Sequence, residues 1–234
     1  MEKVVKTGGR ERKVVMGMFV NRTDAGVRLA EMLKDYSERE GVLVLALPRG
    51  GVVVGFELAR RLRVGLDVLI VRKIGVPSQP ELAAGAISET GTVHLNQDVI
   101  SAIGDMSAYI QKEIARQSEE IARRIMLYRN GKPIRELTGK TIILVDDGIA
   151  TGATMKAAIE TMKKEPIIKL VVAVPVAPPS TAEELKHMAD EVVCIETPEY
   201  FTAVGSHYID FTQVTDEEVV KLLRQSENFG EKAA

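Results

Sequence analysis

The chain has 234 residues, 45% of them hydrophobic, which is enough for one large α/β domain or two small ones. Its 31 basic and 33 acidic residues leave a formal charge of −2, which provides no general attraction to nucleic acid or anionic lipid. A single cysteine excludes an intrachain disulfide and a cysteine-based metal cluster. Because no apolar stretch approaches the roughly 20 residues of a membrane span, and the first 15 residues lack a signal-peptide pattern, we expect a cytoplasmic protein without membrane or nucleic-acid partners.

Strand-length apolar runs alternate with helical patterns along most of the chain. After a basic extension over residues 1–17, expected to be a solvated and partly mobile terminus, Thr23–Tyr36 has the pattern of a short helix. Five runs rich in Val, Ile and Leu resemble strands buried on both faces of a parallel sheet: Val42–Leu47, Leu66–Val71, Thr141–Val145, Ile167–Val176 and Val192–Ile195. Helical patterns follow the first, third and fourth of them: Gly51–Leu62, Gly152–Lys164 and Ser180–Met188. This order predicts a single α/β domain with a doubly wound, mainly parallel five-stranded sheet.

Two segments interrupt the alternation. Gly75–Asn96 is rich in Gly, Pro, Ser and Thr, and we interpret it as a flexible loop or loose hairpin that could act as a lid. Asp105–Arg129 has the pattern of one long helix with an apolar stripe. The stripe predicts a homo-oligomer interface, although packing onto the parent sheet explains it nearly as well.

The most informative run extends from Val145 to Thr154. An apolar strand leads directly into two carboxylates, Asp146 and Asp147, then into a turn with two glycines and two threonines, and then into a helix. Open α/β sheets bind ligands at the carboxyl ends of strands, where this loop would lie. N–H groups at the helix start could hold a phosphate, and a carboxylate pair suits a vicinal diol. The run therefore predicts a site for ribose 5-phosphate.

A strand that ends in Asp-Asp-Gly is compatible with a simple turn, and Thr-Gly-x-Thr with a simple helix start, but their union in one unbroken run is far more specific. The chain has no GxxxxGK[ST] P-loop, no GxGxxG after a strand and no GxSxG elbow.

The same run resembles the phosphoribosyl-pyrophosphate motif of type I phosphoribosyltransferases. The resemblance implies that Asp146 and Asp147 hold the ribose hydroxyls and that the loop after them wraps the 5-phosphate. It is carried by Asp146, Asp147, Gly148, Ala150, Thr151, Gly152, Ala153 and Thr154.

Two further segments resemble parts of that family. Arg49, Gly50 and Gly51, after the first strand, are similar to its short pyrophosphate loop, in which the glycines offer N–H groups and the arginine can pair with a diphosphate. Arg72 and Lys73 open the Gly/Pro segment as in the family's flexible catalytic loop, which implies that they contact pyrophosphate and gives Lys73 a catalytic role; a surface basic pair explains them equally well.

The pattern from Arg72 to the acidic pair resembles a subgroup of stand-alone proteins described as predicted phosphoribosyltransferases, over Phe19 to about Val219. The resemblance implies a carboxy-terminal hood over residues 197–215 that recognises the acceptor. Tyr200 and Phe201 are its candidates for stacking on a base, and packing is the alternative role.

The resemblance implies transfer of ribose 5-phosphate from phosphoribosyl pyrophosphate, with Mg²⁺, to a nitrogen nucleophile, expected to be a nucleobase. Mg²⁺ would be held mostly by the substrate's own oxygens and by water rather than by protein side chains. Two alternatives stay open: a regulatory protein that keeps the nucleotide site but binds RNA or a protein partner without turnover, and a scaffold that uses the long helix as an interface.

Overall fold

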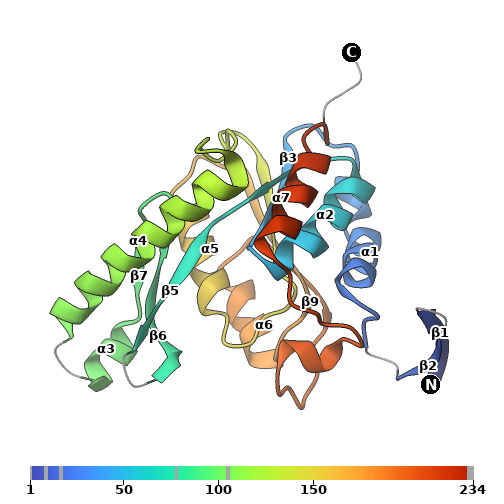
Figure 1. Cartoon of the computed structure of the whole chain (residues 1–234), viewed down its shortest axis with the longest axis horizontal. Helices are drawn as coiled ribbons and strands as arrows, with labels where there is room; N and C mark the ends of the chain where they lie inside the picture. The colour runs from blue at the N-terminus through green and yellow to red at the C-terminus, as the bar shows by residue number, and fades with distance from the viewer. Residues whose placement is uncertain (1, 8–9, 16–17, 77–78, 104–105, 231–234) are drawn as a thin grey trace.

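A five-stranded parallel sheet forms the centre of the fold in the computed structural model, which describes residues 2–7, 10–15, 18–76, 79–103 and 106–230 (Figure 1). Its strands are β3 (Val42–Ala46), β4 (Gly65–Val68), β8 (Thr141–Val145), β9 (Lys169–Val176) and β10 (Glu191–Glu196). They lie in the order β10-β9-β8-β3-β4, and every neighbouring pair is parallel. Each of the five apolar runs supplies one strand, so the predicted sheet is confirmed.

Helices cover both faces of this sheet. The helices α1 (Arg22–Met32) and α2 (Gly50–Leu62) pack on one face, and α5 (Ala153–Met162) and α6 (Pro179–Lys186) pack on the other. Because neighbouring side chains of a strand point to opposite faces, Val44 and Ile143 belong to one hydrophobic cluster, whereas Leu45 and Leu144 belong to the other. The doubly wound arrangement follows from strands that are apolar on both faces.

The chain reverses its direction across the sheet between β3 and β8. From β3 it passes through α2 to β4 at one edge, and from β8 it passes through α5 and α6 to β10 at the other edge. The carboxyl ends of β3 and β8 therefore lie side by side, and Leu47 N–H donates to the Val145 carbonyl at 2.9 Å. Ligands of open α/β sheets bind at such a switch point.

Of the two expectations for residues 75–96, a flexible loop or a loose hairpin, the structure has the hairpin; residues 77–78 lie outside the described residues. The strands β5 (Val71–Val76), β6 (Gln79–Ser88) and β7 (Val93–Leu95) pair as an antiparallel sheet of their own. The predicted second strand is divided: β4 ends at Val68, and β5 begins at Val71. The glycines fit this sheet because they allow close backbone approach: a Cβ on Gly85 would lie 2.2 Å from the His94 carbonyl oxygen.

The long helix α4 (Ser107–Arg129) lies along the antiparallel sheet, as Figure 1 shows, after the short α3 (Gln97–Ile103). It also contacts the carboxy-terminal helix α7 (Asp216–Gln225), while α5 contacts the other side of the antiparallel sheet. Ile110, Ile121 and Tyr128 of the apolar stripe are buried within the chain itself. The chain itself therefore buries much of the stripe, which supports packing onto the parent chain; the oligomer stays a prediction.

A short hairpin and two short helical turns complete the described fold. The extension over residues 1–17 contains a hairpin of β1 (Glu2–Thr7) and β2 (Arg10–Val15), which the sequence pattern did not indicate. Short 3-10 turns cover Lys34–Tyr36 and Val204–His207. No helix within the described ranges is long and apolar enough to cross a membrane.

Candidate functional site

The acidic pair lies at the switch point, immediately after β8. Arg22 of α1 donates from Nε to Asp147 Oδ2 at 2.7 Å, and the backbone N–H of Asp147 donates to Asp146 Oδ1 at 2.8 Å. Tyr208 donates its hydroxyl to the Asp147 carbonyl oxygen at 2.5 Å. Both carboxyl groups are held in place while remaining only partly covered, so they can still receive a ligand.

The start of α2 closes against the two carboxylates because it carries no side chain there. A Cβ on Gly50 would lie 1.9 Å from Asp147 Oδ2, and a Cβ on Gly51 would lie 2.9 Å from Asp146 Cα. The preceding Pro48–Arg49 peptide bond is cis. The structure thus brings together two stretches, 49–51 and 146–147, that the sequence analysis singled out separately, and at this contact only glycine fits.

The rest of the run forms the turn into α5. Gly148 has φ +154°, and a Cβ there would lie 2.5 Å from Val204 Cγ1; Gly152 has φ +75° and precedes the helix. Thr151 is exposed, whereas Ala153 and Thr154 lie half-buried in the first helical turn. No side chain caps the start of α5. Its first N–H groups have no partner within the helix, so they are available to an anion.

Ala150 completes this turn and has a structural contact. Ala150 is exposed to solvent, and its carbonyl oxygen accepts a hydrogen bond from Thr181 Oγ1 at 3.0 Å. This bond fixes the loop against the start of α6.

Burial and mutual repulsion disfavour ionisation of the pair. Burial, and then the neighbouring charge of Asp147, raises the pKa of Asp146 well above its usual value. Burial also raises the pKa of Asp147, and Arg22 opposes that rise through its charge and its hydrogen bond. The two carboxyl groups therefore titrate as one interacting site, and Arg22 is the cation that favours its ionised form.

Arg22 is a site residue that sequence reasoning missed. It is the first residue of α1; besides pairing with Asp147 it donates to the Thr212 carbonyl at 2.8 Å, and its guanidinium lies 3.8 Å from the ring centre of Phe211. A cation in the first turn opposes the helix dipole. This unfavourable position of Arg22 at the start of an expected helix was the only sign in the sequence that the residue has a special role. The position does not show that Asp147 is its partner.

Arg49 points toward a second cluster, on α7. Its Nη1 lies 4.0 Å from Asp216 Oδ1, which also accepts the hydroxyl of Tyr128 from α4. Arg123 approaches the other oxygen of Asp216 at 3.4 Å. Asp216 therefore connects α4 and α7 to the loop that carries Arg49, and about a third of the Arg49 side chain stays exposed.

The structure separates the roles of Arg72 and Lys73. Arg72 Nε donates to Gln117 Oε1 of α4 at 2.9 Å, so its guanidinium is directed toward the long helix. Burial lowers the pKa of Arg72 from its ordinary value, with a smaller effect from Arg124. Lys73 is its neighbour on β5, so its side chain extends to the opposite face, which α5 covers. Arg72 and Lys73 therefore lie on opposite sides of the antiparallel sheet, Arg72 toward α4 and Lys73 toward α5.

The aromatic residues of the hood differ in their exposure and contacts. Tyr200 exposes 87% of its surface, and Phe201 stacks on His207 with ring centres 5.3 Å apart. The buried Tyr208 packs on Phe211, with ring centres 4.9 Å apart. Tyr208 and Phe211 thus support the acidic pair, and Tyr200 is open to a partner.

No group of three His, Cys, Asp or Glu side chains that could hold a metal ion occurs in the described part of the chain. The acidic pair supplies two carboxyl groups, and one of them is already engaged by Arg22.

A parallel sheet with an acidic pair and an uncapped helix start at its switch point places this chain among the doubly wound α/β domains, which bind ligands at such points. The family described as the phosphoribosyl transferase domain matches residues 21–211. The chain belongs to this family.

Individual relatives agree with that assignment. Two curated proteins of Mycobacterium tuberculosis, from strains CDC 1551 and H37Rv, are named provisionally as phosphoribosyl transferases; each is 46% identical over 220 residues, covering 94% of this chain and 49% of its own length. The chain thus spans about half the length of these relatives. The crystal structure of TT1426 from Thermus thermophilus is 44% identical, covers 89% of this chain and 99% of its own, and superposes with a TM-score of 0.76.

Proposed function

We propose that this protein transfers ribose 5-phosphate from phosphoribosyl pyrophosphate to a nitrogen nucleophile, with release of pyrophosphate. One observation carries the proposal: the acidic pair faces the side-chain-free start of α2 and adjoins the uncapped start of α5. Carboxylates for a diol and N–H groups for a phosphate thus lie at neighbouring points, as a ribose 5-phosphate requires.

Each part of the donor has a matching group. Asp146 and Asp147 accept the ribose hydroxyls, and the loop from Gly148 to Thr154 receives the 5-phosphate. Gly50 and Gly51 lie in the first turn of α2, where N–H groups have no partner within the helix, so the diphosphate would lie along the start of α2. Arg49 can reach it because about a third of its side chain is exposed and Asp216 holds it only loosely. We assign Lys73 to the leaving group as well, from the opposite side.

The chemistry follows from displacement at the anomeric carbon. Positive charge develops on the ribose as the bond to pyrophosphate breaks, and the ionised acidic pair stabilises that charge electrostatically. Mg²⁺, bound by the diphosphate oxygens and water, would neutralise the leaving group. For the acceptor we propose a nucleobase that stacks on the exposed ring of Tyr200, with Phe201 behind it on His207.

Isothermal titration with phosphoribosyl pyrophosphate and Mg²⁺ tests the donor site. The wild type should bind one equivalent, and the variant with Asp146→Asn and Asp147→Asn should lose binding while its circular dichroism spectrum is unchanged. Undiminished affinity in this folded double variant would contradict the site.

Turnover is tested separately with a panel of purines, pyrimidines and amines, by following pyrophosphate release. Release that depends on one acceptor supports the transferase and names its substrate. Donor binding without release for any acceptor would instead favour the regulatory alternative.

A further inference from the structure

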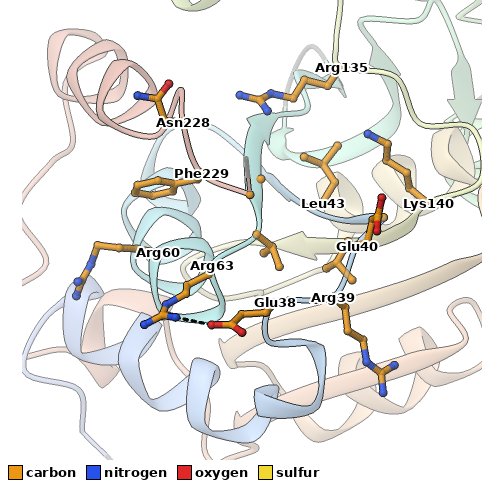
Figure 2. A pocket seen from close by; sticks show the side chains of 15 residues that line it. Glu38, Arg39, Glu40, Leu43, Arg60, Arg63, Arg135, Lys140, Asn228 and Phe229 are labelled. Carbon is orange, nitrogen blue, oxygen red and sulfur yellow. Dashed lines mark hydrogen bonds and ion pairs between the residues drawn. The ribbon is translucent and has the colours of Figure 1, made fainter. Parts of the chain in front are cut away.

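A second cavity lies at the edge of the central sheet opposite the acidic pair. It has a volume of about 770 Å³ and is enclosed by the turn before β3, the end of α2, the loop before β8 and the carboxy-terminal segment Asn228–Gly230 (Figure 2). Val42 and Gly65 begin their strands here, whereas residues 146–152 follow the carboxyl end of β8. The cavity is therefore distinct from the proposed donor site.

The cavity is basic although the whole chain is slightly acidic. Five cationic side chains and two carboxylates line it, an excess of 5 − 2 = 3 positive charges: Arg39, Arg60, Arg63, Arg135 and Lys140 against Glu38 and Glu40. Part of this charge is compensated, because Arg63 pairs with Glu38 and Arg60 with Glu57. Charge of one sign in a concave site concentrates ligands of the opposite sign.

Arg39, Arg135 and Lys140 are the cations outside these pairs, and Arg39 lies over the Tyr36 ring, 5.7 Å from its centre. Among the described residues, the Arg135 guanidinium donates to a backbone oxygen alone, that of Glu227 at 3.3 Å, and the backbone N–H of Arg135 donates to Asp67 Oδ2 at 2.9 Å. No carboxylate within the described ranges forms an ion pair with the Lys140 ammonium. Arg135 and Lys140 are both half-buried, and Figure 2 shows their side chains among those that line the cavity, so an anion bound by them would be partly shielded from water.

The floor and one wall of the cavity are fixed. A Cβ on Gly65 would lie 3.2 Å from Leu43 Cδ1 and 3.6 Å from Arg135 Nη1, so a glycine there keeps the floor open beneath the guanidinium. Phe229 packs on Phe56 of α2 with ring centres 5.3 Å apart, which holds the last described turn against the domain. Leu43, Val64 and Phe229 give the cavity an apolar part beside its cations.

We propose that this cavity binds a nucleoside diphosphate or triphosphate, with the phosphates on Arg135 and Lys140 and the nucleoside against the apolar wall. Arginine binds phosphate oxygens in a bidentate manner, and lysine adds a point charge. The volume falls within the range of small-molecule sites, roughly 300–1,000 Å³. The residues on the cavity differ from those of the proposed donor site, so this site does not depend on the transferase function.

The test is titration of ADP, without Mg²⁺, into the full chain carrying Asp146→Asn and Asp147→Asn, so that the donor site does not compete. We expect saturable binding of one equivalent, and a loss of at least about tenfold in affinity when Arg135→Gln and Lys140→Gln are added. The matched control, Lys112→Gln with Lys186→Gln, removes the same charge from exposed positions outside the cavity and should leave the affinity unchanged.

Two results would overturn the proposal. Absence of ADP binding at millimolar concentration excludes the site, and an equal loss in the control variant shows general electrostatic attraction only. Lys140→Gln alone, which leaves the guanidinium in place, provides a second variant if the double substitution impairs folding. Failure of phosphoribosyl pyrophosphate to bind the wild type would contradict the donor site but not this one.

Discussion

The guanidinium of Arg22 and the carboxylate of Asp147, 125 positions apart in the chain, form an ion pair at 2.7 Å. Their side chains expose only 10% and 15% of their surface, so water screens the pair little. The first residue of α1 thus opposes the rise in pKa that burial causes at Asp147, the residue that we assign to the ribose hydroxyls.

Replacing Arg22 by Gln should destabilise the protein in a pH-dependent way. Burial already raises the pKa of Asp147, and removal of the cation raises it further, which leaves an unpaired buried carboxylate at neutral pH. We expect a loss of about 3 kcal/mol in the free energy of unfolding near pH 7. The loss should shrink as the pH falls and vanish below about pH 4, where Asp147 is neutral in both the folded and unfolded states.

Urea unfolding between pH 4 and pH 8 measures this difference. Arg61→Gln removes an arginine whose side chain is 44% exposed and is the control, with an expected loss below about 1 kcal/mol at every pH. Donor affinity should also need a higher pH in the Arg22 variant, because the ionised carboxylate accepts the hydroxyls. A loss of stability that is equal at pH 4 and pH 8 would show that Arg22 acts by packing alone.

Gly50→Ala should impair the site by direct collision. The added Cβ would lie 1.9 Å from Asp147 Oδ2 and 3.0 Å from Arg22 Nε, so the ion pair must move. We expect a cost of about 1–3 kcal/mol in stability, despite the better helix propensity of alanine. A double-mutant cycle checks the cause: in an Asp147→Ala background the same substitution should cost much less. Equal costs in both backgrounds would place the strain elsewhere.

Tyr128→Phe tests the connection between α4 and α7. The Tyr128 hydroxyl donates to Asp216, and burial together with that bond raises the pKa of Tyr128. Its removal should lower the free energy of unfolding by about 1 kcal/mol. Tyr109→Phe on the same helix is the control, because its hydroxyl has no hydrogen bond to any other described residue. Similar losses for the two variants would count against the role of the Asp216 contact.

Hydrogen exchange tests whether the antiparallel sheet closes over the donor. The ladder between β5 and β6 pairs Arg72 with Ile87 and Lys73 with Ala86, so these amides should be protected with or without ligand. We predict that phosphoribosyl pyrophosphate and Mg²⁺ together add protection over residues 75–83, toward the far end of the β5–β6 hairpin, because closure brings Lys73 onto the leaving group. Unchanged exchange over this stretch would mean a rigid hairpin without a lid function.

The local pattern of residues was enough to predict the central sheet and the part of the site that runs from Asp146 to Thr154. The runs that form β3, β4, β8 and β9 are buried on both faces over most of their length, whereas the edge strand β10 is half-buried; apolar strands of this kind are recognisable without knowledge of their neighbours. The acidic pair, its glycines and the start of α5 are contiguous from Asp146 to Thr154, so their spacing was visible in the sequence. The glycines at 50 and 51 were also found, although not the reason for them, which is the close approach of Asp146 and Asp147.

Tertiary structure decided everything that depends on contacts between distant segments. Arg22 meets Asp147 only because α1 packs beside the switch point, and Arg72 turns to Gln117 because α4 lies over the antiparallel sheet. The same sheet converts a segment rich in Gly and Pro into paired strands, since backbone pairing supplies the order that its side chains do not predict. The apolar stripe of α4 specified that a face would be buried, and only the fold determined that the chain itself buries it.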